Sequence, residues 1–491
     1  MKSLLLNEVR QAVHGEWKTE FHKGLVNGVS TDSRQIKQDD LFIALRGQKH
    51  DGHKFIGDAI AAGAKGVIVD RNMPLTEQMQ AQDICVIQVP DTLVALGQLA
   101  RFYRKVLGHG VTVIAVTGSN GKTTTKEMIY HVLSKHRNGW RSPGNFNNAV
   151  GVPLSVFGID PDHDFAVLEL GTNAPGEIAA LSRIAQPDIA VVTSVSAAHL
   201  EGLRNLDGVC AEKASIVTGL RERGVIVCSN EYQPLVDKLR PTGHTLIRFG
   251  IDQNAEISAS ELEARDGTVR FRTNDRAEVR LPMIGQHNVH NALAALAVSR
   301  RLGISSDAFA DAIADFPGIP RRMSVHDVNG ITIIDDAYNA NPAGMAAAIE
   351  ELVRRSGARR RVFACGDMLE LGADAEYYHR ELGRLIARSN IDLLFATGEL
   401  SAITAQAAIE NGMGVGAVQK SINSRRLARL IKSSIRDEDV ILVKGSFSMQ
   451  MDLVVGSLKR YRGNRPILRT HIRETVMTDK TRRSSARSSR T

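Results

Sequence analysis

Short apolar, β-branched runs alternate with helix-length segments along most of the chain. The runs lie at 111–116, 165–170, 189–195 and 225–228 in the middle of the chain, and at 331–334, 361–365, 393–397 and 440–444 further on. Runs of this length separated by helical patterns are typical of βαβ units, so we predict parallel sheets in an α/β fold. Ligands of such sheets bind beyond the carboxyl ends of the strands.

Two breaks divide this pattern. At 87–100 (VIQVPDTLVALGQLA) a proline follows a strand-like run and a new helix begins, and at 315–323 (DFPGIPRRM) two prolines and a glycine interrupt the pattern. A chain of 491 residues is long enough for roughly three domains. We therefore predict domains at 1–88, 89–317 and 318–463, followed by a tail at 464–491.

Composition and charge narrow the class of protein. The chain is 43% hydrophobic and 24% charged, as globular proteins are, and no apolar run approaches the ~20 residues of a membrane helix. We interpret the start, MKSLLLNEVRQAV, as an amphipathic helix and not as a signal peptide. The cysteines lack CxxC spacing and suit reduced thiols in the cytoplasm; they are Cys85, Cys210, Cys228 and Cys365.

The net charge of +8 is concentrated in the tail. Residues 464–491 hold eight Lys and Arg against two acids, and the remainder carries only +2. The tail is poor in apolar residues, so we predict that it is disordered. Contact of this tail with RNA or anionic lipid is the alternative, but we expect no nucleic-acid partner because the body shows no basic stripe.

The stretch VIAVTGSNGKTTTKEMI (113–129) predicts a phosphate-binding loop between a buried strand at 113–116 and a helix from Thr123 onward. Glycines let backbone N–H groups converge on phosphate oxygens, Lys122 supplies a positive charge, and the Thr123 hydroxyl suits Mg²⁺. The standard pattern GxxxxGK[ST] has glycine where this chain has Val116, so the loop is a variant. We predict a site for a nucleoside triphosphate; its residues are Thr117, Gly118, Ser119, Asn120, Gly121, Lys122, Thr123 and Thr124.

TGSNGKT resembles the ATP loop of the Mur ligases, which form amide bonds in peptidoglycan precursor synthesis; folylpolyglutamate and cyanophycin synthetases have a similar loop. The further blocks that resemble the Mur ligases are GNFNNAVGVPLS, ELGTNAPGEIAAL, AAHLEGL, DDAYNANPAGM and GDMLELGADAEYYHRELG. The resemblance implies an N-terminal UDP-binding α/β domain, a central P-loop ATPase domain with a parallel sheet and a C-terminal Rossmann-like α/β domain.

The resemblance also implies the reaction. In this family ATP phosphorylates a carboxylate, an amine attacks the acyl phosphate, and ADP and phosphate are released. Among the reactions of the family, the block DDAYNANP favours joining D-alanyl-D-alanine to UDP-MurNAc-tripeptide. The resemblance further implies ATP and Mg²⁺ as cofactors and the cytoplasm as the compartment, and we expect a monomer. A sister ligase that adds a single amino acid is one alternative. A P-loop module that switches its binding to a partner is another, although it would not need further acidic, histidine and lysine groups beside the loop.

Three residues are candidates for metal binding and catalysis beside Lys122 and Thr123. Glu169 ends the run FAVLEL and is either a Mg²⁺ ligand or a solvated acid at a strand end. The resemblance makes His199 a ligand of a second metal ion. It also makes Lys213, otherwise an ordinary surface lysine of a helix, a carbamylated lysine whose amine must first lose its proton.

Further nucleotide contacts follow from the resemblance. It assigns Asn291 to the adenine with His287 beside it, Arg322 to the nucleotide and Asp336 to the ribose. Without the resemblance, Asn288 in the stretch 285–296 is explained as the cap of a helix. Likewise, the adjacent acids Asp335 and Asp336 are either a metal site or a solvated turn.

The remaining candidates bind the two substrates. The stretch 30–56 resembles the family's UDP-sugar domain; without the resemblance, its polar turn at 30–34 would be an ordinary polar loop. The hydroxyls and Arg34 of this turn suit pyrophosphate; its residues are Ser30, Thr31, Asp32, Ser33 and Arg34. The muramoyl-peptide contacts that the resemblance implies are Asn145, Asn147, Asn148, Thr172 and Asn173. Those near the nucleotide and the incoming amine are Tyr338, Asn339 and Asn341. KGSFSM departs from the family's KGSRSM, since Phe447 stands where an arginine is usual and cannot bind an anion.

Overall fold

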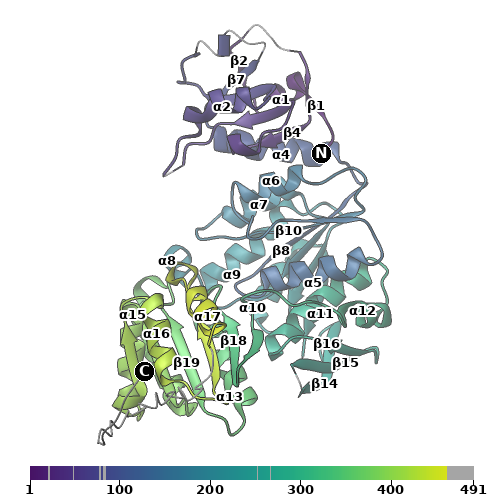
Figure 1. Ribbon diagram of the computed structural model, residues 1–491. Helices are drawn as coiled ribbons and strands as arrows, with labels where there is room; N and C mark the ends of the chain where they lie inside the picture. Colours follow the sequence, from purple (N-terminus) through teal and green to yellow (C-terminus); the bar gives the residue numbers. More distant parts are fainter. Residues whose placement is uncertain are drawn as a thin grey trace, which may run out of the picture.

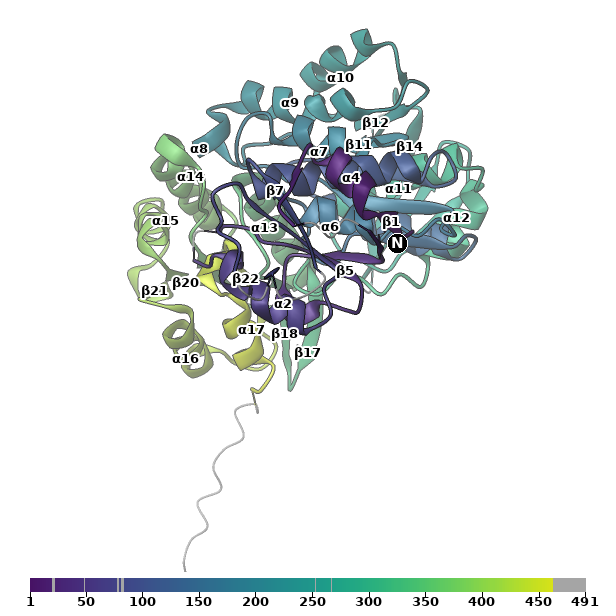
Figure 2. The same cartoon turned by 90° about the horizontal axis from the view of Figure 1, so that it is seen from above.

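The computed structural model describes residues 1–19, 23–47, 49–76, 79–80, 84–251, 253–265 and 267–461. These residues form three α/β bodies in a row, which we call the N-terminal body (sheet at 16–89), the middle body (sheet at 112–281) and the C-terminal body (sheet at 324–444) (Figure 1). The predicted three-domain α/β fold is therefore confirmed. Figure 2 shows the C-terminal body lying to one side of the middle body. The predicted disorder of 464–491 concerns residues outside the described ranges.

The N-terminal body is a five-stranded sheet in the order β2-β7-β6-β5-β4, in which only β2 runs antiparallel to its neighbour. A second, two-stranded sheet pairs β1 with β3. The elements are β1 (Leu4–Leu5), α1 (Leu6–Ala12), β2 (Glu16–Trp17), β3 (Leu25–Val26), β4 (Gly28–Ser30), η1 (Ser33–Gln35), β5 (Asp40–Ile43), η2 (Gly52–Phe55), α2 (Ile56–Ala61), β6 (Gly66–Asp70) and β7 (Cys85–Val89). The amphipathic helix predicted at the start is α1, which buries Leu6 and Val9.

Helix α4 (Thr92–Val106) connects the N-terminal and middle bodies. It begins after Pro90, where the Asp91 carboxylate accepts hydrogen bonds from the N–H groups of the first turn. Its buried side chains Leu96, Leu99 and Tyr103 belong to one apolar cluster that contains residues of β5–β7 as well as residues of the middle body. The two bodies therefore share a core, which fixes their relative orientation.

The middle body has a nine-stranded sheet in the order β16-β15-β14-β13-β12-β11-β8-β10-β9. The strands from β9 to β14 are parallel, as predicted, whereas β15 and β16 extend the sheet with antiparallel pairing that we did not predict. The strands are β8 (Thr112–Thr117), β9 (Gly139–Arg141), β10 (Phe165–Glu169), β11 (Ile189–Val192), β12 (Val225–Ser229), β13 (Thr245–Gly250), β14 (Ile257–Arg265), β15 (Thr268–Thr273) and β16 (Glu278–Leu281).

Helices cover both faces of this sheet. They are α5 (Lys122–Ser134), α6 (Gly151–Phe157), α7 (Glu177–Ala185), α8 (Leu200–Leu203), α9 (Leu206–Ala214), η3 (Ser215–Gly219), α10 (Gln233–Leu239), η4 (Arg240–Thr242), α11 (Gln286–Arg301) and α12 (Ser306–Ile313). The apolar face predicted for the helix after the loop is confirmed, since Met128, Ile129, Val132 and Leu133 of α5 are fully buried. Helix α5 packs against α11, so the helix that follows the phosphate loop is anchored in the core.

The C-terminal body has a six-stranded sheet in the order β17-β18-β22-β19-β20-β21, parallel except for β17. Its elements are β17 (Ser324–Val328), β18 (Ile331–Asp336), α13 (Pro342–Ser356), β19 (Arg361–Gly366), η5 (Gly372–Asp374), α14 (Ala375–Arg388), β20 (Leu393–Thr397), α15 (Glu399–Glu410), η6 (Val415–Ala417), β21 (Val418–Ser421), α16 (Ser424–Ser434), β22 (Val440–Lys444), η7 (Phe447–Met449) and α17 (Asp452–Leu458). The four strands predicted in this part are confirmed as β18, β19, β20 and β22.

Two predictions about the chemical class of the chain are also testable in the fold. In the part of the chain that the structure describes, we find no helix with the length and hydropathy that crossing a bilayer requires. All four cysteines lie among the described residues and are buried, and no disulfide joins any two of them.

Candidate active site

The phosphate loop joins β8 to α5 and depends on two glycines. Gly118 has φ 150° and Gly121 has φ 80°, which residues with a side chain rarely adopt. Lys122 begins α5, one residue earlier than predicted, and its ammonium donates to the carbonyl oxygens of Gly118 (2.7 Å) and Ser119 (3.3 Å). The side chain of Lys122 thus bends back onto the phosphate loop.

The segment after β11 forms hydrogen bonds with this loop. The Ser119 N–H donates to the carbonyl of Ser194 (2.9 Å), and the Asn120 N–H donates to the Ser194 hydroxyl (2.9 Å). The Thr193 hydroxyl donates to the carbonyl of Asn120 (2.5 Å). The backbone of the loop is therefore held in one conformation.

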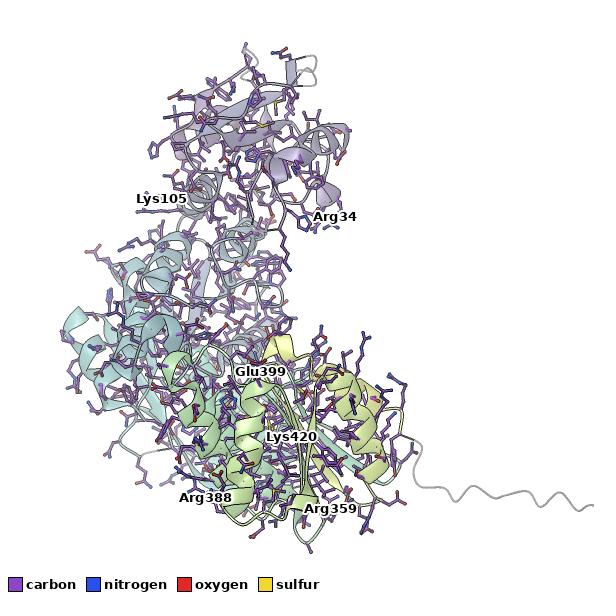
Figure 3. The ribbon with its side chains drawn as sticks, turned by 90° about the vertical axis from the view of Figure 1, so that its left-hand side faces the viewer. Arg34, Lys105, Arg359, Arg388, Glu399 and Lys420 are labelled. Carbon is purple, nitrogen blue, oxygen red and sulfur yellow. The ribbon has the colours of Figure 1, made fainter. Side chains whose placement is uncertain are left out.

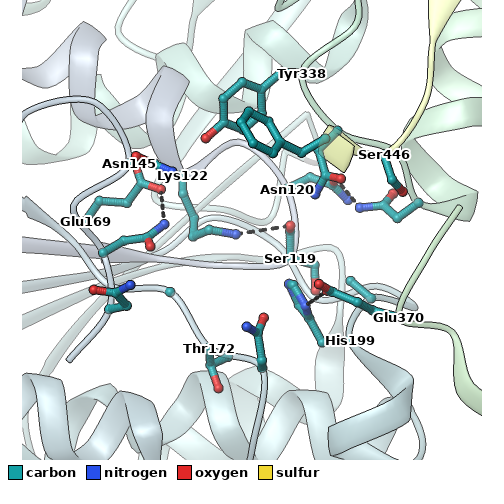
Figure 4. Close-up of a pocket in the computed structure, with 18 of the residues that line it drawn as sticks. Ser119, Asn120, Lys122, Asn145, Glu169, Thr172, His199, Tyr338, Glu370 and Ser446 are labelled. Carbon is teal, nitrogen blue, oxygen red and sulfur yellow. Dashed lines mark hydrogen bonds and ion pairs between the residues drawn. The ribbon is translucent and has the colours of Figure 1, made fainter. Parts of the chain in front are cut away.

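A cleft of about 580 Å³ lies between the middle and C-terminal bodies, in front of the loop (Figure 4). It brings together most of the residues predicted from the sequence. Those that line it are Ser119, Asn120, Gly121, Lys122, Asn145, Asn147, Asn148, Glu169, Thr172, Asn173, His199, Arg322, Tyr338, Asn339 and Asn341. The bodies also touch across it, because the Asn341 amide donates to the Asn120 side chain (2.7 Å).

Glu169 is buried at the floor of the cleft, with 2% of its surface exposed, so its interpretation as a solvated acid is wrong. One carboxylate oxygen accepts a hydrogen bond from the Asn147 amide (2.9 Å), and the other has no hydrogen-bond partner among the described residues. The buried ammonium of Lys126 lies 3.7 Å from that second oxygen and donates to the carbonyls of Ser142 (2.9 Å) and Gly144 (3.0 Å). Lys126 therefore ties the loop that carries Asn147 to the carboxylate.

Lys213 lies on α9 and is completely buried, so its interpretation as a surface lysine is wrong. Its amine has no hydrogen-bond partner within the described ranges. Burial lowers the pKa of Lys213 well below its usual value, and the positive charge of Lys122 lowers it further, while Glu212 and Glu177 oppose the shift. Burial also lowers the pKa of Lys122, which the carboxylate of Glu169 partly offsets.

His199 faces the cleft from the start of α8, and a residue of the C-terminal body holds it. Its Nδ1 lies 2.6 Å from a carboxylate oxygen of Glu370, as Figure 4 shows. The hydrogen bond from His199 lowers the pKa of Glu370. The imidazole thus has one nitrogen engaged across the boundary between two bodies.

A second cavity of about 490 Å³ adjoins the cleft beside Thr123. The wall common to both cavities contains Arg322, whose guanidinium lies 3.9 Å from the centre of the Tyr338 ring, and Phe447, whose ring centre is 5.8 Å from that of Tyr338. Phe447 is 62% exposed. The neighbouring Arg321 instead forms an ion pair with Asp452 on α17 (3.5 Å).

Several residues predicted in the middle and C-terminal bodies line neither cavity. Asn291 accepts from the Thr125 hydroxyl (3.3 Å) and donates to Asn288 (3.0 Å). Asn288 does not cap its helix, because its amide donates to the carbonyl of Ile284 (2.7 Å) and the capping residue is Gly285. The others that line neither cavity are Thr117, Gly118, Thr124, Lys213, His287 and Asp336.

The adjacent acids of β18 are neither a shared metal site nor a solvated turn. Both are buried and, as neighbours on a strand, point to opposite faces. Asp336 pairs with Lys444 and accepts from the Met323 N–H (3.2 Å), whereas Asp335 accepts from the Ala337 N–H (3.2 Å). Burial raises the pKa of Asp335.

The polar turn Ser30–Arg34 belongs to the N-terminal body and does not join the cleft; Figure 3 labels Arg34 on the side of that body nearer the middle body. Two guanidinium nitrogens of Arg34 donate to the Asp32 carboxylate (2.9 and 2.8 Å). This hydrogen bonding lowers the pKa of Asp32 to about 2. Arg34 is highly exposed, so its guanidinium is open to solvent, whereas the Ser30 hydroxyl donates to the Asp32 carbonyl (3.0 Å).

Sequence reasoning missed Lys126 and Glu370 as parts of the site. Lys126 lies four residues after Lys122, hence on the same face of α5, and this spacing could have indicated it. Glu370 follows the carboxyl end of β19, where ligands of parallel sheets bind. Its pairing with His199 could not be predicted, because it depends on how two bodies meet.

Three family models match the chain. The Mur ligase family, catalytic domain, matches residues 25–104; the Mur ligase middle domain matches 116–299; and the Mur ligase, glutamate ligase domain, matches 321–447. The chain belongs to the Mur ligase family.

Particular relatives resemble it over almost its whole length. UDP-N-acetylmuramoyl-tripeptide–D-alanyl-D-alanine ligase of Bacillus subtilis (strain 168) is 36% identical over 443 residues, which are 89% of this chain and 94% of that protein. A crystal structure of MurF from Acinetobacter baumannii has a TM-score of 0.84 and 30% identity, covering 94% of this chain and 99% of that one. MurF ligase from Thermotoga maritima in complex with ADP has a TM-score of 0.78 and 27% identity, covering 89% and 98%.

Proposed function

We propose that this chain is an ATP-dependent ligase that joins D-alanyl-D-alanine to UDP-MurNAc-tripeptide and releases ADP and phosphate, a step of peptidoglycan synthesis. The name that its relatives carry supports this reaction. The observation that carries the proposal is the cleft, in which the phosphate loop with Lys122, the buried Glu169 and the polar residues of the C-terminal body surround one space.

The reaction has two steps. A carboxylate oxygen of the tripeptide attacks the γ-phosphorus of ATP, the bond to ADP breaks, and an acyl phosphate forms. The amine of the dipeptide then attacks the carbonyl carbon, loses a proton and expels phosphate. Phosphoryl transfer is catalysed mainly by positioning and by neutralising charge, which is the role of Lys122 and of the N-terminus of α5.

We propose that Mg²⁺ binds at Thr123, Glu169, His199 and Lys213. The unpartnered buried oxygen of Glu169 fits such an ion, which bound there would offset phosphate charge and polarise the γ-phosphoryl group. Among the described residues no three His, Cys, Asp or Glu side chains are grouped closely enough to hold a metal ion. The set therefore requires the threonine hydroxyl, phosphate oxygens and a modified Lys213.

We propose that this modification is a carbamate. The neutral Lys213 amine attacks the carbon of CO₂ and releases one proton, which replaces a potential cation by an anion. Burial favours the neutral amine that this step needs, and the unpartnered nitrogen leaves it available. The positive charge of Lys122 repels a protonated Lys213 amine, whereas it would attract the negative charge of a carbamate at the same position.

We assign the substrates to residues of all three bodies. We propose that Ser30–Arg34 bind the UDP group, that the asparagines at 145–148 with Thr172 and Asn173 hold the peptide, and that Tyr338, Asn339 and Asn341 hold the dipeptide. The predicted domain bounds at 88 and 317 and the nucleotide contacts of Asn291, Arg322 and Asp336 stay proposals. ATP and UDP-linked sugars are cytoplasmic substrates, so we propose that compartment.

An acceptor screen that measures ADP release tests the function. ATP and UDP-MurNAc-tripeptide should yield ADP only when D-alanyl-D-alanine is added. Turnover of UDP-MurNAc-dipeptide with diaminopimelate or lysine, and none with D-alanyl-D-alanine, would assign the chain to a sister reaction. ADP release that needs neither peptide nor amine would indicate a binding switch.

A further inference from the structure

Glu370 reaches from the C-terminal body to a side chain of the middle body. It follows β19 in the loop before η5, and its carboxylate lies 2.6 Å from Nδ1 of His199, the residue before α8. Both residues line the cleft, and Figure 4 shows the two side chains pointing toward each other across the boundary.

The backbone on both sides is shaped for this contact. His199 has φ 56° and Glu370 has φ 64°, a conformation uncommon for residues other than glycine. The Glu201 N–H donates to the Glu370 carbonyl (3.2 Å), and a Cβ on Gly372 would lie 3.0 Å from the Cα of Glu201. The two segments are therefore in close backbone contact beneath the pair.

Stability alone does not account for this arrangement. The Glu370 side chain is 51% exposed, and exposed ion pairs contribute little. Holding two non-glycine residues at positive φ costs more than such a pair contributes. Other non-glycine residues of the chain also have positive φ outside the cleft, so it is the contact between His199 and Glu370 across two bodies, and not the backbone conformation by itself, that points to a function.

The contact determines which imidazole nitrogen is available. With Nδ1 beside a carboxylate, the proton of neutral His199 sits on Nδ1 and the lone pair on Nε2. Carboxylates that hold metal-binding histidines in this way fix both the tautomer and the orientation of the ring. In the part of the chain that the structure describes, the hydrogen bonds of the His199 ring involve Nδ1 alone.

We propose that Glu370 is a positioning residue of the metal site: it orients His199 so that Nε2 can bind the metal ion only when the C-terminal body is docked on the middle body. This inference rests on the proposed role of His199 as a metal ligand. It makes metal binding depend on domain closure, because the ligand and the group that orients it come from different bodies.

Mn²⁺ binding to the full-length protein with ADP, followed by electron paramagnetic resonance, tests the inference. Glu370→Ala and His199→Ala should each weaken Mn²⁺ binding by about 10- to 100-fold, and the double variant should bind no more weakly than His199→Ala. Glu370→Gln keeps an acceptor oxygen and should retain most of the affinity. Glu376→Ala is the matched control, because Glu376 forms its ion pair with Arg380 on the same helix, α14, and does not line the cleft, so binding should be unchanged.

A spectroscopic readout separates orientation from mere docking. With ¹⁵N-labelled histidine, the coupling of a nitrogen to Mn²⁺ should be present in the unaltered protein, absent in His199→Ala and diminished in Glu370→Ala. Unchanged affinity and coupling in Glu370→Ala, with weakened binding in His199→Ala, would overturn the inference and leave the proposed metal set standing. Unchanged binding in His199→Ala would instead remove His199 from that set and the inference with it. Equal weakening by Glu376→Ala would also overturn the inference.

Discussion

Gly118→Ala should disable the phosphate loop, because the added methyl group has no room. The residue has φ 150°, and a Cβ there would overlap the Thr193 hydroxyl and lie 3.0 Å from the Ser194 nitrogen. The Thr193 hydroxyl cannot move away freely, since it donates to the carbonyls of Thr117 (3.2 Å) and Asn120 (2.5 Å). The loop must therefore be strained or displaced.

The size of the effect follows from the backbone conformation. Holding a non-glycine residue in a sparsely populated region costs about 1–3 kcal/mol. If the loop stays in place, the cost lowers the stability of the middle body. If the loop moves, the cost weakens nucleotide binding, by about 5- to 150-fold at 1.4 kcal/mol per factor of ten.

Two measurements together determine the free-energy cost of Gly118→Ala. They are the affinity for ADP, by isothermal titration calorimetry, and the melting temperature of the protein without nucleotide. Gly243→Ala is the control, since Gly243 also has positive φ (75°) but a Cβ there would meet nothing within 4 Å. It should lower stability slightly and leave ADP affinity unchanged. In a Thr193→Ala background the Gly118→Ala effect should shrink, because one of the two clashes is gone.

If Gly118→Ala binds ADP as tightly as the unaltered protein and melts at the same temperature, the loop tolerates a side chain. The assignment of 117–124 as a phosphate cradle built on glycine would then be refuted.

Three further predictions concern buried titratable groups. Lys213→Ala should abolish ligase turnover, with partial rescue by a small carboxylic acid. In the unaltered enzyme a falling pH protonates the Lys213 amine and so opposes carbamate formation. Removal of CO₂ should therefore reduce the activity of the unaltered enzyme more at low pH than at high pH. Full activity of Lys213→Ala would exclude the carbamate. Lys126→Met leaves Glu169 buried without its nearest cation and should destabilise the protein by about 3 kcal/mol or more, seen as a lowered melting temperature; an unchanged value would contradict the pairing. Burial lowers the pKa of His287 to about 4, so His287 takes up its proton only on unfolding, and stability should fall as pH drops from about 6.5 toward 4. His287→Gln should flatten this slope, and an equal slope in both proteins would contradict the shift.

The sequence predicted the strands of the parallel sheets because burial on both faces imposes continuous apolar runs. The run 189–195 is instructive, since β11 ends at Val192 although Val195 continues the apolar pattern. The Thr193 N–H still donates to Thr117 of β8 (2.9 Å), but the Thr193 hydroxyl and the Ser194 carbonyl bond the phosphate loop, and only the position of that loop could reveal this.

The sequence predicted most of the residues that line the site, but not the burial and the charge pairing of its side chains. Lys122 begins the helix that follows a strand and a glycine loop, and Glu169 stands at a strand end; the sequence pattern shows both positions, and both side chains line the cleft. The environment of Lys213 was not readable, because a lysine on a helix has the same sequence signature whether it faces solvent or a core. The pair of His199 and Glu370 depends on the meeting of two bodies, which no local pattern encodes.

The transfer of an oxygen atom tests the central claim most directly. UDP-MurNAc-tripeptide labelled with ¹⁸O in its terminal carboxylate is converted with ATP and D-alanyl-D-alanine, and the released phosphate is analysed by mass spectrometry. An acyl phosphate intermediate predicts that each phosphate carries one oxygen from the peptide. Amide product formed with unlabelled phosphate would contradict the account.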